Sequence, residues 1–180
     1  PQAVREFLNF FAGTIGNANT RQAYGKALAR FFRWVQRRGL TLQAIEAAHV
    51  GTYLSWLAQQ PAARGGTISI GTVKQSLAAI RSLFDHLVLT QVVRQNPATS
   101  VRGPRQVIDA GKTPVLDAGE ARQLLESIDT RDLLGLRDRA LIGVMVYSFA
   151  RVGAAVGLNV EDYSVQGKRW YLTLHEKRGR

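Results

Sequence analysis

The chain contains no cysteine and only three histidines among its 180 residues. Without cysteine, disulfides and thiolate metal ligands are excluded. His49, His86 and His175 are far apart and lack the spacing of a metal-binding motif, so we expect no metal site and no cofactor. No apolar run approaches the roughly 20 residues that a membrane-spanning helix needs, and residues 1–15 show no secretory signal. We therefore expect no membrane association and a cytoplasmic location.

Acidic residues are scarce in the first half of the chain. Residues 1–102 hold 12 Lys and Arg against 3 Asp and Glu, a balance of +9, whereas residues 103–180 hold 12 against 10, a balance of +2. This asymmetry favours a polyanionic partner of the first half, and nucleic acid is the commonest one. The alternative is a basic surface that serves only solubility.

The first half also carries the apolar periodicity of four helices, at residues 2–12, about 20–38, about 44–59 and about 69–89. Asn19 or Thr20 is predicted to cap the second helix, and Gly39 to end it. The apolar residues at helical spacing are, helix by helix, Val4, Phe7, Leu8 and Phe11; Tyr24, Leu28, Phe31 and Val35; Val50, Tyr53, Leu54 and Leu57; and Val73, Leu77, Ile80, Phe84 and Leu87.

A linker and a second domain follow. Residues 103–114 mix Gly, Pro and basic residues without an apolar period, which is typical of a linker. Asp117 and Glu120 have the spacing of a capping box, which predicts the start of a helix. A second helix is expected at about 134–150, and alternating residues near 162–165 and 169–174 predict a hairpin that turns at Gln166-Gly167. Leu141, Ile142, Met145, Val146 and Phe149 are expected to be the buried residues of the second helix.

Three motifs in this order are distinctive: Thr20 to Tyr24 (TRQAY), Thr72 to Phe84 (TVKQSLAAIRSLF) and Asn96-Pro97-Ala98. They precede the block from Arg137 to Lys177, in which Arg151 follows an apolar helix and Lys177 follows a strand. The whole series resembles the tyrosine recombinase (phage integrase) family. The resemblance implies a mainly α protein: a four-helix SAM-like DNA-binding domain at 1–102, the linker at 103–114, and a truncated α+β catalytic domain with a small antiparallel sheet at 115–180.

The resemblance also implies a reaction. In this family a tyrosine attacks a DNA phosphodiester, which gives a 3′-phosphotyrosine and a free 5′-hydroxyl. Arg151 and Lys177 match the first two catalytic positions, whereas none of the five tyrosines lies where the nucleophile is expected. We therefore interpret the chain as an inactive fragment of a recombinase that forms a homo-tetramer on paired DNA sites. Ala154 occupies a position that is acidic in many relatives, so either another group replaces that carboxylate or the site is braced less well.

The second and fourth helices carry the residues that we expect to contact double-stranded DNA. Most of these residues should bind phosphates, and Gln75 is a candidate for reading a base edge. The candidates are Arg21, Lys26, Arg30, Arg33, Lys74, Gln75 and Arg81.

Simpler interpretations stay open at this stage. Arg151 has the sequence setting of an ordinary helix-end arginine, and Lys177 that of a solvated basic turn. The protein as a whole has two alternatives, a DNA-binding protein without enzymatic activity and a helical module that binds an acidic protein.

Overall fold

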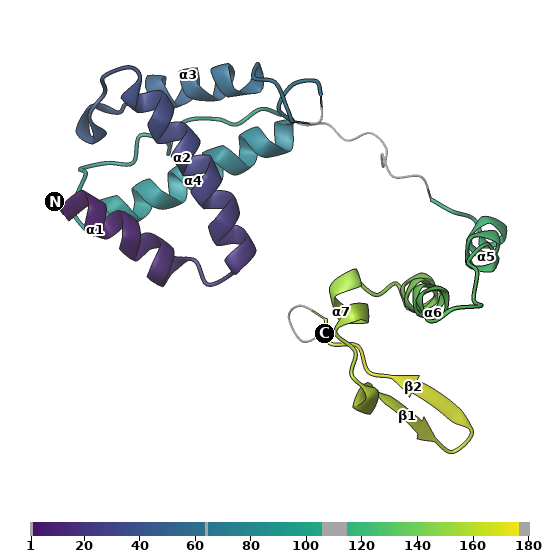
Figure 1. Ribbon diagram of the computed structural model, residues 1–180. Helices are drawn as coiled ribbons and strands as arrows, with labels where there is room; N and C mark the ends of the chain where they lie inside the picture. The colour runs from purple at the N-terminus through teal and green to yellow at the C-terminus, as the bar shows by residue number, and fades with distance from the viewer. Residues whose placement is uncertain (1, 64, 106–114, 177–180) are drawn as a thin grey trace. The chain divides into compact units, whose positions relative to one another are not determined.

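The computed structural model describes residues 2–63, 65–105 and 115–176 (Figure 1). The chain divides into two compact units, Pro1–Ile108 and Asp109–Arg180, and this division falls within the stretch that we assigned to the linker. No helix in the described ranges is both long enough and apolar enough to cross a membrane.

The first unit is built around its fourth helix, Ile70–Leu89, which is also its longest. Helix α1 (Gln2–Asn9) continues as a π-helix (Phe10–Thr14), and α2 (Ala18–Gln36) follows. A 3₁₀ turn (Leu42–Ala44) then leads to α3 (Ala47–Ala58) and to α4 (Ile70–Leu89). Helices α1, α2 and α3 all pack against α4, as Figure 1 shows. The four helices expected from the sequence are thus confirmed.

The core of this unit is formed by the apolar faces of α2, α3 and α4. Phe31, Tyr53 and Phe84 are almost completely buried, and the rings of Phe31 and Tyr53 meet edge to face with centroids 5.0 Å apart. The sequence predicted these faces because each helix buries one stripe of residues spaced three or four apart. The burial of such large side chains supplies most of the free energy that holds a small helical unit together.

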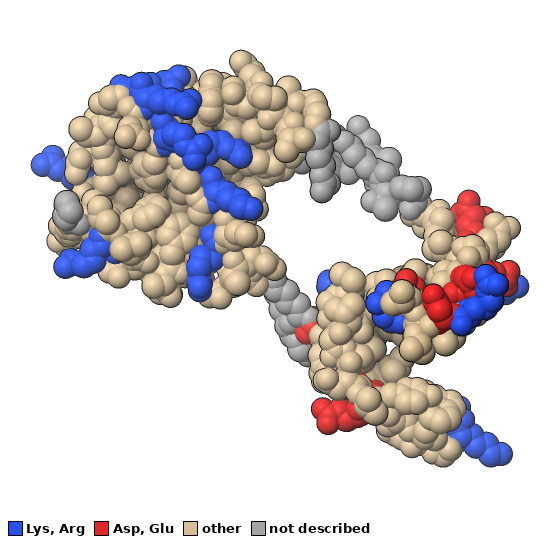
Figure 2. Space-filling model, viewed as in Figure 1, with Lys and Arg blue, Asp and Glu red and all other residues tan. Residues whose placement is uncertain are grey.

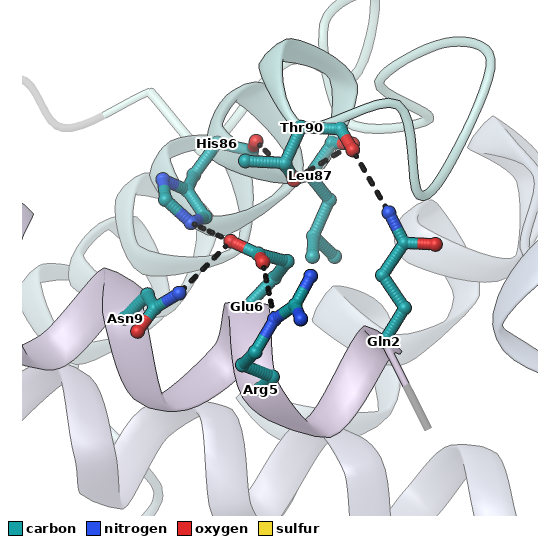
Figure 3. A network of polar contacts seen from close by, with 7 residues as sticks. All are labelled: Gln2, Arg5, Glu6, Asn9, His86, Leu87 and Thr90. Carbon is teal, nitrogen blue, oxygen red and sulfur yellow. Dashed lines mark hydrogen bonds and ion pairs between the residues drawn. The ribbon is translucent and has the colours of Figure 1, made fainter.

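Helix α1 differs from the expected pattern. Its charged Glu6 faces inward, as does Phe10 in the π-helix that follows, whereas Val4 and Leu8 are exposed by 57% and 62%. Val4 and Leu8 therefore lie outside the buried face, although they have helical spacing with Phe7 and Phe11. The burial of Glu6 is possible because polar groups contact its carboxylate, and these groups come partly from α4. Figure 3 shows this network: Asn9 Nδ2 donates to Glu6 Oε2 at 3.2 Å, and His86 Nε2 lies 3.6 Å from the same oxygen.

The start of α2 also differs from the prediction. Asn17, not Asn19 or Thr20, is the N-cap, and its Oδ1 accepts a hydrogen bond from the amide of Thr20 at 3.1 Å. Thr20 is therefore the third residue of the helix. At the other end, Gly39 has a φ of +64°, a conformation that costs a glycine little, and it lets the chain leave the helix as expected.

The second unit is smaller and less densely packed. Helices α5 (Ala118–Glu126), α6 (Leu133–Ser148) and α7 (Val152–Val156) come first. A 3₁₀ turn (Val160–Asp162) leads to the antiparallel strands β1 (Tyr163–Gln166) and β2 (Arg169–Leu172). The expected capping box is present, because Glu120 N donates to Asp117 Oδ1 at 2.8 Å and Asp117 N donates to Glu120 Oε2 at 2.9 Å. The hairpin turn is formed by Gly167, with a φ of +64°, and Lys168, one residue later than expected, because Gln166 still pairs with Arg169 at the end of β1.

The predicted buried face of α6 is only partly buried. Leu141, Ile142, Met145 and Val146 are half-buried, and Phe149 is 91% exposed. The reason is that α5 and α7 pack against α6, but no sheet covers it within residues 115–176. Phe149 also has a φ of 54°, so the chain leaves the helix there. The second strand ends at Leu172, two residues earlier than expected.

Candidate nucleic-acid interface and cleavage site

A row of basic side chains follows the outer side of α2. The core-facing residues of this helix, from Ala27 to Val35, pack on α3 and α4, which leaves its long cationic side chains at the surface. Arg21, Lys26 and Arg33 are exposed, and Arg30 is half-buried. Figure 2 shows a band of Lys and Arg over this unit and no acidic side chain on the face in view.

Helices α2 and α4 enclose a shallow groove of about 250 Å³. Its α4 side begins close to the N-terminus of that helix, where Ser69 Oγ accepts a hydrogen bond from the amide of Thr72 at 3.2 Å. The positive end of the α4 dipole and the cations of α2 favour an anion in the same place. The lining residues are Gln22, Ala23, Lys26, Ala27, Arg30, Thr72 and Gln75.

A second groove, of about 640 Å³, lies along another side of α4. Lys74 and Arg81 line it from the helix, and Gly103, Pro104 and Arg105 line it from the segment that we assigned to the linker. A β-carbon on Gly103 would lie 3.4 Å from Leu77, so this segment runs close against the helix. Four of the seven predicted DNA contacts, Lys26, Arg30, Lys74 and Gln75, are thus brought to grooves that flank α4 without a hydrogen bond that holds them inward.

Arg81 and Arg21 are more constrained. Arg81 donates from Nε to the carbonyl of Ala98 at 3.0 Å and from Nη2 to the carbonyl of Val101. Arg21 donates to the carbonyl of Ile15 from Nε at 3.2 Å and from Nη2 at 2.9 Å. Both guanidinium groups therefore hold loops of the first unit, and their role as DNA contacts stays a prediction.

The three acidic residues of the first unit weaken this cationic surface little. Glu6 is buried on the inner side of α1, where its hydrogen bond from Asn9 lowers its pKa. Asp85 accepts a hydrogen bond from Asn96 Nδ2 at 2.7 Å. Glu46 lies at the start of α3, in a capping box with His49. None of the three lines the grooves beside α4 that contain Lys26 and Lys74.

In the second unit, Arg151 is the N-cap residue of α7, and its side chain is 73% exposed. Its guanidinium forms an ion pair with Glu176 through Nη1, and its backbone amide donates to the other carboxylate oxygen of Glu176 at 3.1 Å. The residue is thus neither buried nor paired with helix-end carbonyls. It faces the segment that follows β2, and Glu176 immediately precedes Lys177 in the sequence.

Asp162 holds the segment that follows β2 in place. Its side chain is 8% exposed, and one carboxylate oxygen lies 2.7 Å from Nε2 of His175. The other oxygen accepts a hydrogen bond from the amide of Asn159 at 2.8 Å. The pKa of Asp162 is held below its ordinary value by these hydrogen bonds. The bond from Asn159 has the larger effect, and that of His175 has the next largest. The burial of Asp162 and its two bonded carboxylate oxygens indicate a structural role.

Lys177 lies outside the described residues. Tyr147, Tyr163 and Tyr171 are exposed, whereas Tyr53 is buried in the first unit, where burial raises its pKa to about 12. No three His, Asp or Glu side chains in the described ranges gather as metal ligands.

Sequence reasoning missed two members of these sites. Arg105 was assigned to the linker, yet it lines the second groove. Glu176 was not among the predicted site residues, yet it is the partner of Arg151. The contact between Arg151 and Glu176 joins residues 25 positions apart in the sequence, so no local sequence pattern predicts it.

The first unit is a module of four packed helices, and comparison with known proteins identifies its family. The model of the phage integrase N-terminal SAM-like domain matches residues 2–93, which include α1 to α4. The chain therefore belongs to the phage integrase family of tyrosine recombinases, and the resemblance inferred from its motifs is confirmed.

Two curated relatives illustrate the extent of the match. Tyrosine recombinase XerC of Vibrio atlanticus is 32% identical over 158 residues, which cover 76% of this chain and 50% of the relative. Tyrosine recombinase XerD of Listeria monocytogenes is 28% identical over 162 residues, which cover 88% of this chain and 52% of the relative. The chain thus spans about half the length of these curated relatives.

A solved structure shows the same fold. The XerH site-specific recombinase, bound to a palindromic difH substrate in a post-cleavage complex, matches with a TM-score of 0.65 at 20% sequence identity. The match covers 88% of this chain and 46% of that chain. This likeness confirms the expected fold class, a mainly helical protein with a SAM-like first domain and a small antiparallel sheet in the second.

Proposed function

We propose that this chain is the DNA-binding unit and the first part of the catalytic unit of a site-specific tyrosine recombinase or integrase. The observation that carries the proposal is the cationic surface of α2 and α4, where Lys26, Arg30 and Lys74 line grooves that contain no carboxylate. Grooves of this charge suit the phosphates of duplex DNA. The curated relatives named above, which are tyrosine recombinases, support the same assignment.

In the proposed reaction a tyrosine oxygen bonds to phosphorus while the bond from phosphorus to the 5′-oxygen breaks. Negative charge gathers on the non-bridging oxygens, and the planar guanidinium of Arg151 offers them paired donors. The departing 5′-oxygen needs a proton, and Lys177 is the proposed donor. The covalent phosphotyrosine conserves the bond energy, so the strand can be rejoined without nucleotide hydrolysis.

Further parts of the proposal concern the whole protein. None of the five tyrosines lies at the position expected for the nucleophile, so we propose that this chain alone binds DNA but does not cleave it. The complete recombinase would act on paired sites as a homo-tetramer. Because its substrate is DNA, the protein would work where the chromosome is, inside the cell.

The test is the salt dependence of binding to random-sequence duplex DNA, measured by fluorescence anisotropy. Each phosphate contact that is lost should reduce the slope of log K against log salt by about 0.9, so K26A/R30A should reduce it by roughly 2. Arg94→Ala is the matched control, because Arg94 is exposed in the same unit but lines neither the groove of Lys26 nor the groove of Lys74. An affinity that stays constant from about 50 to 200 mM salt would instead favour an acidic protein partner.

A further inference from the structure

Arg151 is held by one carboxylate at two points. Glu176 accepts a hydrogen bond from the backbone amide of Arg151 with one oxygen and pairs with its guanidinium through the other. The Glu176 side chain is 18% exposed and that of Arg151 73%, so Glu176 is the anchored partner. An exposed arginine normally samples many rotamers, and contacts of one carboxylate with both its backbone amide and its guanidinium restrict them.

The anchor itself is fixed by three contacts from one residue. Asp162 accepts a hydrogen bond from the amide of Thr173 with its backbone carbonyl at 2.9 Å, and its side chain holds His175 at 2.7 Å. Its second carboxylate oxygen is bonded to the amide of Asn159. Residues 173–175 are thus pinned to the 3₁₀ turn before β1, and Glu176 reaches Arg151 from the end of that pinned segment.

We infer that Glu176 is a positioning residue, which holds the Arg151 guanidinium by Nη1 so that its Nε and Nη2 edge can bind two oxygens of one DNA phosphate. The inference rests on the proposed function. Among residues 115–176, no group accepts a hydrogen bond from Nε or Nη2, so this edge has donors to offer. A guanidinium that is oriented before the phosphate arrives loses less entropy on binding it.

The contact between Glu176 and Arg151 also explains how the site can lack a carboxylate at position 154. A carboxylate at that position would lie one turn along α7 from Arg151, but the alanine is buried and brings none. Of the other acidic groups nearby, Asp162 is committed to Asn159 and His175, and Glu161 is exposed without a recorded partner among the described residues. Glu176 therefore supplies the bracing carboxylate from a different element.

The opposite arrangement is that Glu176 occupies Arg151 and competes with the phosphate. A double-mutant cycle on the affinity of the 180-residue chain for duplex DNA separates the two. If Glu176 positions Arg151, Arg151→Ala should weaken binding by about tenfold when Glu176 is present and by about twofold or less beside Glu176→Gln. Glu161→Gln is the control for the loss of one negative charge in the same unit.

Two outcomes of these measurements would overturn the inference. If Glu176→Gln strengthens binding more than Glu161→Gln does, Glu176 is a competitor. If Arg151→Ala costs the same in both backgrounds, the two residues are not coupled through DNA, and Glu176 is merely structural.

A second measurement, without DNA, keeps this inference separate from the proposed function. Glu176→Gln should accelerate hydrogen exchange of the Arg151 amide by about tenfold and broaden the range of conformations of its Nε–H group in NMR relaxation. Unchanged exchange and relaxation would refute the positioning role even if DNA binds as proposed. Conversely, Glu176→Gln could cause these NMR changes while the parent chain shows no salt-dependent DNA binding. That result would refute the proposed function and leave the contact between Glu176 and Arg151 intact.

Discussion

The chemistry of single residues in this protein depends on where each charged group finds its partner. Arg81 is an example, because its sequence position on α4 suggests a DNA contact, whereas its guanidinium bonds to the carbonyls of Ala98 and Val101. Asn96 adds to the same junction by donating to the carbonyl of Arg81 at 3.0 Å. A cation on a helix with predicted DNA contacts can thus hold the fold together instead, and sequence alone does not separate the two roles.

Glu6 provides a test at this scale. The hydrogen bond from Asn9, together with Arg5 and His86, holds the pKa of Glu6 below its ordinary value against the opposing effect of burial. A carboxyl with a lowered folded-state pKa stabilises the protein above its unfolded-state pKa, and this stabilisation is lost as the pH falls through the folded-state value. Glu6→Gln should therefore be less stable than the parent at neutral pH and should lose less stability on acidification.

Urea unfolding followed by tryptophan fluorescence, at a series of pH values from about 7 to 3, measures this effect. The gap between parent and Glu6→Gln should narrow toward the acidic end, because the parent carboxyl is then protonated too. Glu126→Gln removes an exposed carboxylate on α5 and should leave the pH profile unchanged. Parallel profiles for parent and Glu6→Gln would show that the network of Figure 3 does not depend on the charge of Glu6.

At the scale of elements, the sequence was most informative where one helix face decides burial. The apolar stripes of α3 and α4 predicted their buried residues, since Val50, Tyr53, Ile80 and Phe84 all lie in the core. The capping box of α5 and the glycine turn of the hairpin were equally readable, because both are local backbone motifs. Local chemistry of this kind needs no knowledge of the rest of the fold.

The sequence was less informative where a distant partner decides the outcome. Glu6 can be buried because the side chains of Asn9 and His86 contact its carboxylate, and Arg151 is held by Glu176, which lies 25 positions away in the sequence. The candidate site was therefore predictable in its residue types but not in its contacts. Lys26, Arg30 and Gln75 were expected from α2 and α4, whereas the groove that joins them depends on how these helices cross.

The cap of α2 gives a prediction for an element. Asn17→Ala removes the side-chain oxygen that accepts the amide of Thr20, and it should destabilise the first unit by about 1 kcal/mol. Asn19→Ala is the matched control, because Asn19 lies inside the first turn and its side chain has no recorded hydrogen bond. Chemical denaturation compares the two. Equal losses of stability, or a larger loss in Asn19→Ala, would instead favour Asn19 or Thr20 as the cap, as the sequence predicted.

At the scale of the whole molecule, the two units differ in how much they bury. The first has a continuous core of aromatic and aliphatic side chains, whereas in residues 115–176 the buried apolar residues are Leu125, Ala154 and Ala155. Local opening is governed by such differences in buried contacts. We therefore expect amide hydrogens of α5, α6 and α7 to exchange faster than those of α3 and α4.

The same contrast predicts independent responses to mutation. Phe31→Ala deletes a completely buried ring that contacts Tyr53, and it should destabilise the first unit by about 3 to 5 kcal/mol. Exchange in α5 and α6, followed by mass spectrometry, should stay unchanged because the core that is damaged belongs to the other unit. Phe149→Ala, at a ring that is 91% exposed, should leave the exchange of α3 and α4 as it is. If Phe31→Ala instead raised exchange in both units alike, they would unfold as one cooperative body, and DNA binding could then be coupled directly to the state of Arg151.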